Sequence, residues 1–260
     1  MLPLDNTIKY HHLLLKIELN DIKKYDLPED YEFVFYKDGD EKDWINIELS
    51  AQEFIEYEEG INAWNEYYTN NKKDLYNRLI FIVDKKSKEK IATVTSYYNT
   101  WTNNKNEAYL HWVAIKKEYQ GLKLARPLIS FALNNLKALG YKEAFISTQT
   151  TTWLAAKLYL DFDAYPYDLN KELTGFQILK GIIGNHDKLM SVQPITSIYD
   201  ETLLKIKNIL LNKHKTIDAF KVITKGNQLI VKIMCFDKLY KYYVDLKQNI
   251  EYDNFICLDS

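Results

Sequence analysis

The sequence predicts an α/β (α+β) protein, with a sheet and helices in its first part and a small C-terminal α+β domain. Two observations support this fold class. Residues 78–115 read as a meander of strands that leads through a turn at Gly121 into an amphipathic helix over 124–139. A polar stretch over 181–194 then precedes a second amphipathic helix and further strands. We therefore expect two packed units in one chain.

Two strands are expected near the start of the chain. Residues 11–18 (HHLLLKIE) and 31–36 (YEFVFY) carry the apolar and aromatic residues typical of strands. Asp40 is a suitable cap for a helix that follows it. The pattern Ser50-x-x-Glu53 predicts that another helix begins there, because it matches a capping box.

The meander consists of predicted strands at 78–84, 90–98 and 107–115, joined by charged or polar turns. The helix over 124–139 has an apolar stripe on one side, so it should pack against the sheet. Gly140 is a typical residue for the end of that helix.

Three more elements complete the first domain. We expect a strand at 143–148, a helix at 151–161 and a last strand over Gly175–Lys180 (GFQILK). The polar segment that follows sets the expected domain limits, 1–190 for the first domain and 195–260 for the second.

The C-terminal domain is expected to consist of one helix and three strands. Gly226 and Asn227 form a two-residue hairpin signal between two of these strands. The predicted helix covers 200–213, and the predicted strands cover about 217–224, 228–236 and 239–247. No motif in this domain indicates a chemical function, although its hairpins could pair across a homodimer.

Composition excludes several classes of protein. The 260 residues have a net charge of −2, which argues against a general nucleic-acid or membrane-surface binder. No run approaches the ~18 apolar residues of a membrane span, and the N-terminus lacks the pattern of a signal peptide. The two cysteines, Cys235 and Cys257, show no pairing pattern, and no Cys/His cluster has zinc spacing. We expect a cytoplasmic protein without a metal.

The stretch Val113–Phe131 (VAIKKEYQGLKLARPLISF) is the main functional signal. A strand runs through a glycine-containing turn into a helix, so free N–H groups and the positive end of the helix dipole meet at one point. Such a point is suited to bind a phosphate. Pro127 predicts that the regular helix begins near Leu124 to Arg126. A Rossmann dinucleotide site is excluded because the turn has one glycine and follows a meander of strands and not a βαβ unit. A P-loop is excluded because no Gly-Lys-Ser/Thr follows the turn.

Residues 120–125 (QGLKLA) resemble the Q/R-x-x-G-x-G/A signature of the GNAT superfamily of acyl-CoA-dependent N-acyltransferases. Residues 113–121 resemble the approach to that turn, and residues 148–159 (TQTTTWLAAKLY) resemble a later motif of the family that contains A-x-x-L-Y. The order of elements also matches, so the resemblance extends over roughly residues 11–185. It implies the GNAT fold with a mixed, centrally splayed sheet, and acetyl-CoA as acyl donor.

The resemblance also implies a set of residues that bind coenzyme A. Main-chain groups of one strand should contact pantetheine, the turn should hold the pyrophosphate, and a hydroxyl in the later motif should donate to a pantetheine carbonyl. The strand residues are Val113 and Ile115, and the hydroxyl is that of Thr152. The residues of the turn are Gln120, Gly121, Leu122, Lys123, Leu124 and Ala125.

The sequence departs from the family pattern at three positions. Lys123 stands where the first glycine is usual, and a left-handed backbone there would cost about 1 kcal/mol for a non-glycine residue. Its ammonium either attracts phosphates or is simply solvated. Asp163 and Ala164 replace a Gly-Phe pair, and Thr152 replaces an Asn.

The resemblance places a general acid at Tyr159, whose phenol can protonate a departing thiolate. Two residues are candidates for the general base, Glu107 and His111. Strand alternation puts Glu107, Tyr109, His111 and Val113 on one face.

The expected function is that of an N-acetyltransferase that joins acetyl-CoA and an amine of a small molecule or peptide in a ternary complex, by direct attack. The helices of residues 40–70 are expected to wall the acceptor site. The alternative is a catalytically silent GNAT-like module, which binds acyl-CoA or nothing and acts in regulation or protein interaction. Binding of acetyl-CoA, and thiol release with a panel of amines, would distinguish the two.

Overall fold

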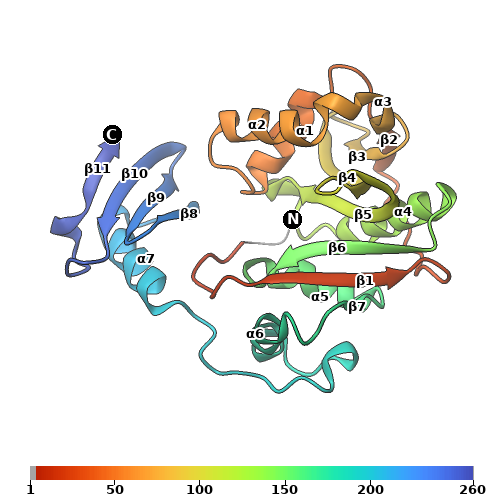
Figure 1. The fold of residues 1–260 in the computed structure, drawn as a ribbon. Coiled ribbons are helices and arrows are strands. Elements are labelled where there is room, and N and C mark those ends of the chain that lie inside the picture. Colours follow the sequence, from red (N-terminus) through yellow and green to blue (C-terminus); the bar gives the residue numbers. More distant parts are fainter. Residues whose placement is uncertain (1–3, 260) are drawn as a thin grey trace.

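The computed structural model describes residues 4–259, and its main sheet has seven strands. They are β1 (His12–Glu18), β2 (Tyr31–Phe35), β3 (Leu79–Asp84), β4 (Lys90–Asn99), β5 (Asn104–Ile115), β6 (Glu143–Gln149) and β7 (Tyr165–Pro166). Their order across the sheet is β2-β3-β4-β5-β6-β1-β7 (Figure 1). Only β5 and β6 run parallel, so the sheet is mixed, as the sequence predicts.

Helices cover both faces of this sheet. Figure 1 shows α1, α2 and α3 on one side and α5 and α6 on the other. One hydrophobic core contains Trp44 of α1 and Trp64 of α2, and another contains Leu128 of α4 and Phe176 of α6. The helices are α1 (Glu41–Ser50), α2 (Tyr57–Tyr67), α3 (Lys72–Leu75), α4 (Ala125–Ala138), α5 (Trp153–Asp161), α6 (Leu173–Ile183) and α7 (Glu201–His214).

The sheet opens at its centre, between β5 and β6. These strands share one paired position, Tyr109 with Phe145, although β5 has 12 residues. Beyond that pair the strands diverge, because the rest of β5 pairs with β4 alone. The predicted central splay is therefore confirmed.

A bulge in β5 lies next to this opening. Thr93 and Thr95 of β4 are two residues apart, whereas their partners Ala114 and His111 are three apart. Trp112 occupies the extra position with a φ of +48°, which is rare for a bulky residue. A bulge at such a place changes the face to which the following side chains point.

The prediction that Val113 shares a face with Glu107, Tyr109 and His111 is therefore wrong. Val113 packs in the same core as Leu110, although the two are three residues apart, because the bulge at the intervening residues shifts the alternation. The His111 ring instead contacts the ring of Tyr67 of α2, with 5.8 Å between centroids.

The segment Gly175–Lys180, which the sequence predicted as a strand, is part of helix α6. The run of apolar residues fits either structure, and packing decides between them. Gly175 lies against β1, where an added Cβ would come within 2.8 Å of Leu13 Cδ2. The buried Lys180 ammonium donates to the carbonyls of Leu189 and Val192, at 2.9 and 2.6 Å.

The predicted helix start at Ser50 is also wrong, because Ser50 is the last residue of α1. The next helix, α2, begins seven residues later at Tyr57, after a loop that contains Glu53. Its start is stabilised by Glu59, whose Oε2 accepts from the N–H groups of Ile55 and Glu56 at 2.9 and 3.4 Å.

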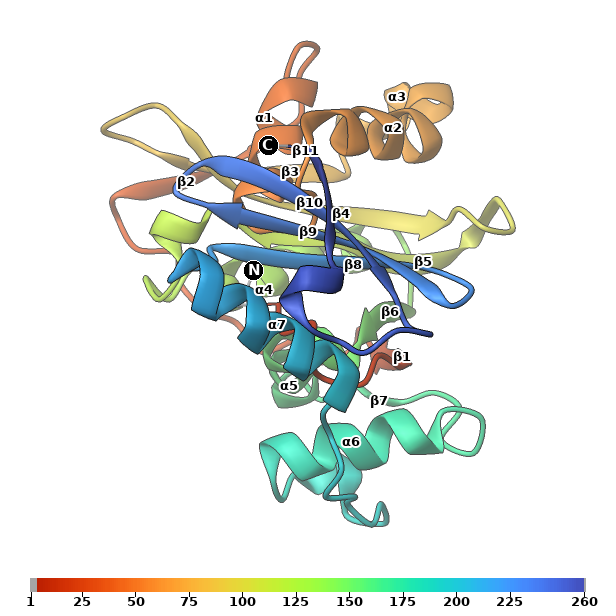
Figure 2. The same cartoon turned by 90° about the vertical axis from the view of Figure 1, so that its left-hand side faces the viewer.

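A second, smaller sheet lies in the C-terminal part of the chain. It consists of β8 (Ala219–Lys225), β9 (Gln228–Cys235), β10 (Lys238–Asp245) and β11 (Ile256–Asp259), in the order β11-β10-β9-β8. The fourth strand was not predicted. Figure 2 looks onto this sheet and shows α7 beside it; Ile206 and Leu210 of α7 pack into its core. Among residues 4–259, no helix is long and apolar enough to cross a membrane.

Three lysines of the small sheet contact the segment that leads into α2. Lys232 pairs with Glu56 and, at 2.8 Å, with Glu59, while Lys241 pairs with Glu56 at 2.9 Å. Lys221 lies 3.5 Å from Glu59. This network joins the C-terminal sheet to the α1–α2 loop, which is one wall of the candidate site.

Candidate functional site

The turn before α4 presents backbone N–H groups to solvent. Gly121 and Lys123 both have a left-handed backbone, with φ of +81° and +62°. The Gln120 side chain secures the turn by donating from Nε2 to the Ile115 carbonyl at 3.0 Å. Within residues 4–259, no backbone acceptor pairs with the N–H groups of Gly121, Leu122 or Lys123. These groups precede the first residue of α4, so the turn is arranged to bind an anion.

A cavity of about 670 Å³, here called the large cavity, adjoins this turn. Its other wall is provided by α5, through Leu154, Leu158 and Tyr159. It thus lies where β5 and β6 diverge, between the helices that follow them. The predicted residues that line it are Val113, Ile115, Gln120, Gly121, Lys123, Leu124 and Ala125.

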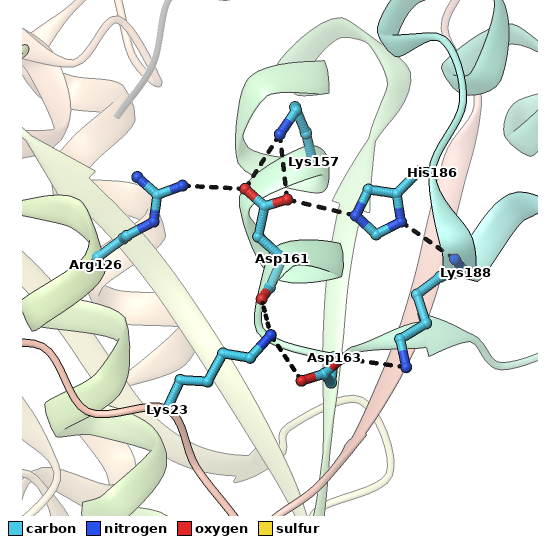
Figure 3. Close-up of polar contacts among 7 residues, drawn as sticks. All are labelled: Lys23, Arg126, Lys157, Asp161, Asp163, His186 and Lys188. Atoms are coloured by element: carbon cyan, nitrogen blue, oxygen red, sulfur yellow. Dashed lines mark hydrogen bonds and ion pairs between the residues drawn. The ribbon is translucent and has the colours of Figure 1, made fainter.

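Basic side chains surround Asp161 at the edge of the large cavity (Figure 3). The Asp161 carboxylate lies 3.1 Å from Arg126 and 3.2 Å from Lys157, and both of these residues line the cavity. Lys23 donates to the Asp161 carbonyl at 2.6 Å and pairs with Asp163 at 2.8 Å.

Cations outnumber carboxylates in this group. Lys188 also pairs with Asp163, at 3.3 Å, so four lysine and arginine side chains face two carboxylates, and the His186 Nε2 atom lies 3.4 Å from Asp161. Hydrogen bonds from Lys23 and Lys188 hold the pKa of Asp163 below its usual value, so that carboxylate is ionised at neutral pH. The group keeps a net positive charge, which favours an anionic ligand at this edge.

A second cavity of about 240 Å³, here called the small cavity, meets the large one at α5. Both cavities are lined by Val113, Ala155 and Tyr159. The small cavity is also lined by His111 of β5 and by Glu53 of the α1–α2 loop. A ligand in each cavity would therefore meet the other at Tyr159.

Burial controls the charge of the groups in the small cavity. It raises the pKa of Tyr159, and the charges of Glu53 and Glu48 raise it further, so the phenol keeps its proton at neutral pH. Burial lowers the pKa of His111 to about 4, so the imidazole is neutral. Neither ring nitrogen of His111 has a hydrogen-bond partner among residues 4–259.

Two of the predicted site residues, Glu107 and Leu122, line neither cavity, and the hydroxyl of a third, Thr152, is already engaged. Glu107 accepts a hydrogen bond from Asn99 and lines a different cavity, near the other end of β5. The Leu122 side chain is 46% exposed and lines neither cavity. Thr152 lines the small cavity, but its hydroxyl already donates to the Gln149 carbonyl at 3.1 Å.

Sequence patterns did not identify Glu53, Arg126, Lys157 or Asp161 as site residues. Arg126 is the second residue of α4, and a basic residue beside a glycine-containing turn is a detectable signal for anion binding. Lys157 lies in the middle of α5 and carries no such signal. Glu53 has no sequence signal for a role in the site, and its spacing from Ser50 instead matches a helix cap. Its position depends on how the α1–α2 loop folds over β5.

Comparisons with solved structures find acetyltransferases whose sequences differ greatly from that of this chain. A GCN5-related N-acetyltransferase from Sphaerobacter thermophilus is 13% identical, with a TM-score of 0.45 over 55% of this chain and 44% of that chain. A GNAT-family acetyltransferase from Colwellia psychrerythraea is 12% identical, with a TM-score of 0.47 over 63% of this chain and 55% of that chain. The match thus covers less than two thirds of either protein. No curated protein matches the sequence.

A family model provides the decisive comparison. The model described as "Acetyltransferase (GNAT) family" matches residues 25–162, which is more than half of the chain. The matched region contains the splayed strands β5 and β6, the turn before α4 and Tyr159. The chain belongs to the GNAT acetyltransferase family.

Proposed function

We propose that this protein is an N-acetyltransferase that transfers an acetyl group from acetyl-CoA to an amine of a small molecule or peptide. Family membership supports acyl transfer in general. One observation supports a ternary complex of enzyme, donor and acceptor: the large and small cavities share the lining residues Val113, Ala155 and Tyr159. Each reactant then has its own cavity, and direct attack needs no covalent enzyme intermediate.

The large cavity suits coenzyme A as the donor. Its phosphates would accept from the N–H groups of Gly121, Leu122 and Lys123, with Arg126 and Lys157 close by. The apolar walls supplied by Leu154 and Leu158 suit the pantetheine arm. The splay between β5 and β6 leaves room for that arm to reach Tyr159.

The chemistry follows from the groups around Tyr159. The neutral amine attacks the thioester carbonyl carbon, and the tetrahedral intermediate collapses with cleavage of the C–S bond. The leaving thiolate takes the Tyr159 proton, which that group retains at neutral pH. The amine passes its own proton to a base. Of the two bases that the sequence suggested, His111 lies in the small cavity and Glu107 does not.

Two measurements test this function. Calorimetry is expected to detect binding of acetyl-CoA, and a thiol assay is expected to detect free coenzyme A when an amine panel is added. Binding without thiol release from any amine would favour the silent module. Absence of both would refute the proposed function.

The Lys123→Gly variant tests the departure from the family pattern. Glycine removes the cost of a left-handed backbone, so we expect a gain of about 1 kcal/mol and a melting temperature higher by about 3 °C. If the Lys123 ammonium attracts phosphates, acetyl-CoA affinity will fall several-fold at low salt.

Lys88→Gly is the matched control for this variant. Lys88 has a φ of +64°, is exposed, and lies in the β3–β4 turn away from both cavities. It should gain similar stability with unchanged affinity for acetyl-CoA. Unchanged affinity in Lys123→Gly as well would show that the Lys123 ammonium is only solvated.

A further inference from the structure

The lining of the small cavity contains a carboxyl group and no basic side chain that pairs with it. Glu53 is the one ionisable carboxylate on the lining, and the described lining contains no lysine or arginine. The lining imidazole, that of His111, is neutral. The Glu53 Oε1 atom is buried and makes no hydrogen bond within residues 4–259. A buried carboxylate oxygen without a partner is costly unless a ligand or a proton satisfies it.

A nearby lysine does not bond to the Glu53 carboxylate, although its positive charge partly opposes the rise in the pKa of Glu53 that burial causes. The Lys221 ammonium donates to the Glu53 carbonyl oxygen at 3.0 Å and lies 3.5 Å from the Glu59 carboxylate. It therefore fixes the backbone of the loop, and the Glu53 side chain remains directed to the cavity lining. Glu48 adds a second buried carboxyl group, and neither of its oxygens has a partner in the described part of the chain.

Aromatic rings make the remaining walls suitable for a cation. The His111 ring lies 5.8 Å from that of Tyr67 and 5.6 Å from that of Trp101, and Tyr67 lies 5.4 Å from Trp112. All four side chains line the small cavity. The faces of such rings attract ammonium groups, and the attraction is stronger where water is excluded.

We propose that the small cavity takes the acceptor as an ammonium ion of a small aliphatic amine, and that Glu53 binds this group and removes its proton. The proposal rests on the function proposed above and names the acceptor class and the base. An acceptor that carries a carboxylate, such as an amino acid, should be rejected, because it would place a second negative charge beside Glu53.

The proton balance is simple. The carboxylate of Glu53 takes one proton from R–NH3⁺, which leaves R–NH2 and a neutral carboxylic acid. Two charges disappear inside a poorly solvated cavity, so burial favours the products. The free amine then attacks the thioester near Tyr159. Burial raises the pKa of Glu53, which makes it a stronger base than an ordinary carboxylate, while burial makes His111 a weaker one.

Acceptor preference is the first test. Thiol release would be measured with n-butylamine, 1,4-diaminobutane and 4-aminobutanoate at pH 7. We expect kcat/KM for the two amines to exceed that for 4-aminobutanoate by about 100-fold or more. Calorimetry on the wild-type protein with coenzyme A present should show butylammonium binding and no binding of 4-aminobutanoate. Equal use of 4-aminobutanoate would overturn the acceptor class.

The Glu53→Gln variant tests the base by its pH profile. In the wild type, kcat/KM for butylamine should be nearly flat from pH 7 to 9, because Glu53 supplies the deprotonation. In Glu53→Gln it should fall about 100-fold at pH 7 and recover about tenfold per pH unit, since only the free amine can react. Glu53→Asp should keep part of the activity and a flatter profile. A merely structural role would not produce recovery with pH.

Glu58→Gln is the control, because Glu58 is exposed in the first turn of α2 and lines neither cavity. It should keep the wild-type rate and pH profile.

Different results would refute the proposed function and the role of Glu53. If acetyl-CoA neither binds nor releases thiol with wild-type protein, the proposed function and this inference both fall. If transfer occurs but Glu53→Gln keeps the wild-type rate and profile, only the role of Glu53 is refuted.

Discussion

The Tyr159→Phe variant is expected to lower kcat by about 100-fold, which is the lower end of the usual contribution of a general acid. The thiolate would then leave without a proton donor. The affinity for acetyl-CoA should change less than twofold, because the aromatic ring that lines the large cavity remains in the variant. Steady-state kinetics and calorimetry measure the two quantities separately.

Tyr10→Phe is the matched control, since Tyr10 is 67% exposed and lines neither cavity. The same atom is removed there, and kcat should not change. A Tyr159→Phe variant that keeps wild-type kcat would remove Tyr159 from the chemistry. A loss of acetyl-CoA affinity with unchanged kcat would instead indicate a role in binding the donor.

The Trp44→Ala variant is expected to destabilise the protein by about 3–5 kcal/mol, the usual cost of removing a large buried aromatic side chain. Trp44 is fully buried in the core between α1 and the sheet. Its ring lies 5.3 Å from that of Trp112, 5.4 Å from Trp64 and 5.6 Å from Tyr68. Urea unfolding should give the difference, and the melting temperature should fall by about 10 °C.

Two further variants separate packing from other effects. Trp44→Phe keeps an aromatic ring and removes an indole N–H that has no partner among residues 4–259, so it should cost less than the alanine change. Trp101→Ala removes a ring that is 59% exposed and should change stability by less than 1 kcal/mol. Equal costs for Trp44→Ala and Trp101→Ala would contradict this account of the core.

Much of the fold could be predicted because its signals are local. The alternation in β3, β4 and β5 and the apolar stripe of α4 each depend on near neighbours in the chain. Pro127 correctly placed the start of α4, which begins at Ala125, because proline is tolerated only in a first turn. The left-handed backbone considered for Lys123 is also present.

The predictions that failed needed information from distant parts of the chain. The apolar residues of GFQILK show no periodicity that distinguishes a strand from a helix. The segment is part of helix α6, in which Gly175 packs closely against β1. Ser50 and Glu53 match a capping box, yet α1 extends through Ser50 because Trp44 and Ile47 anchor it in the core. A local pattern cannot report such tertiary contacts.

The sequence by itself determined the family, the order of the elements and the glycine-containing turn before α4, since each follows from residues that are adjacent or nearly so. Tertiary structure decided the composition of the small cavity. The bulge at Trp112 shifted the alternation of β5, so that His111 and Val113 both line this cavity, and the α1–α2 loop brought Glu53 to the lining that includes Tyr159. Long-range packing sets these positions, so a buried carboxylate without a partner became visible only in the folded chain.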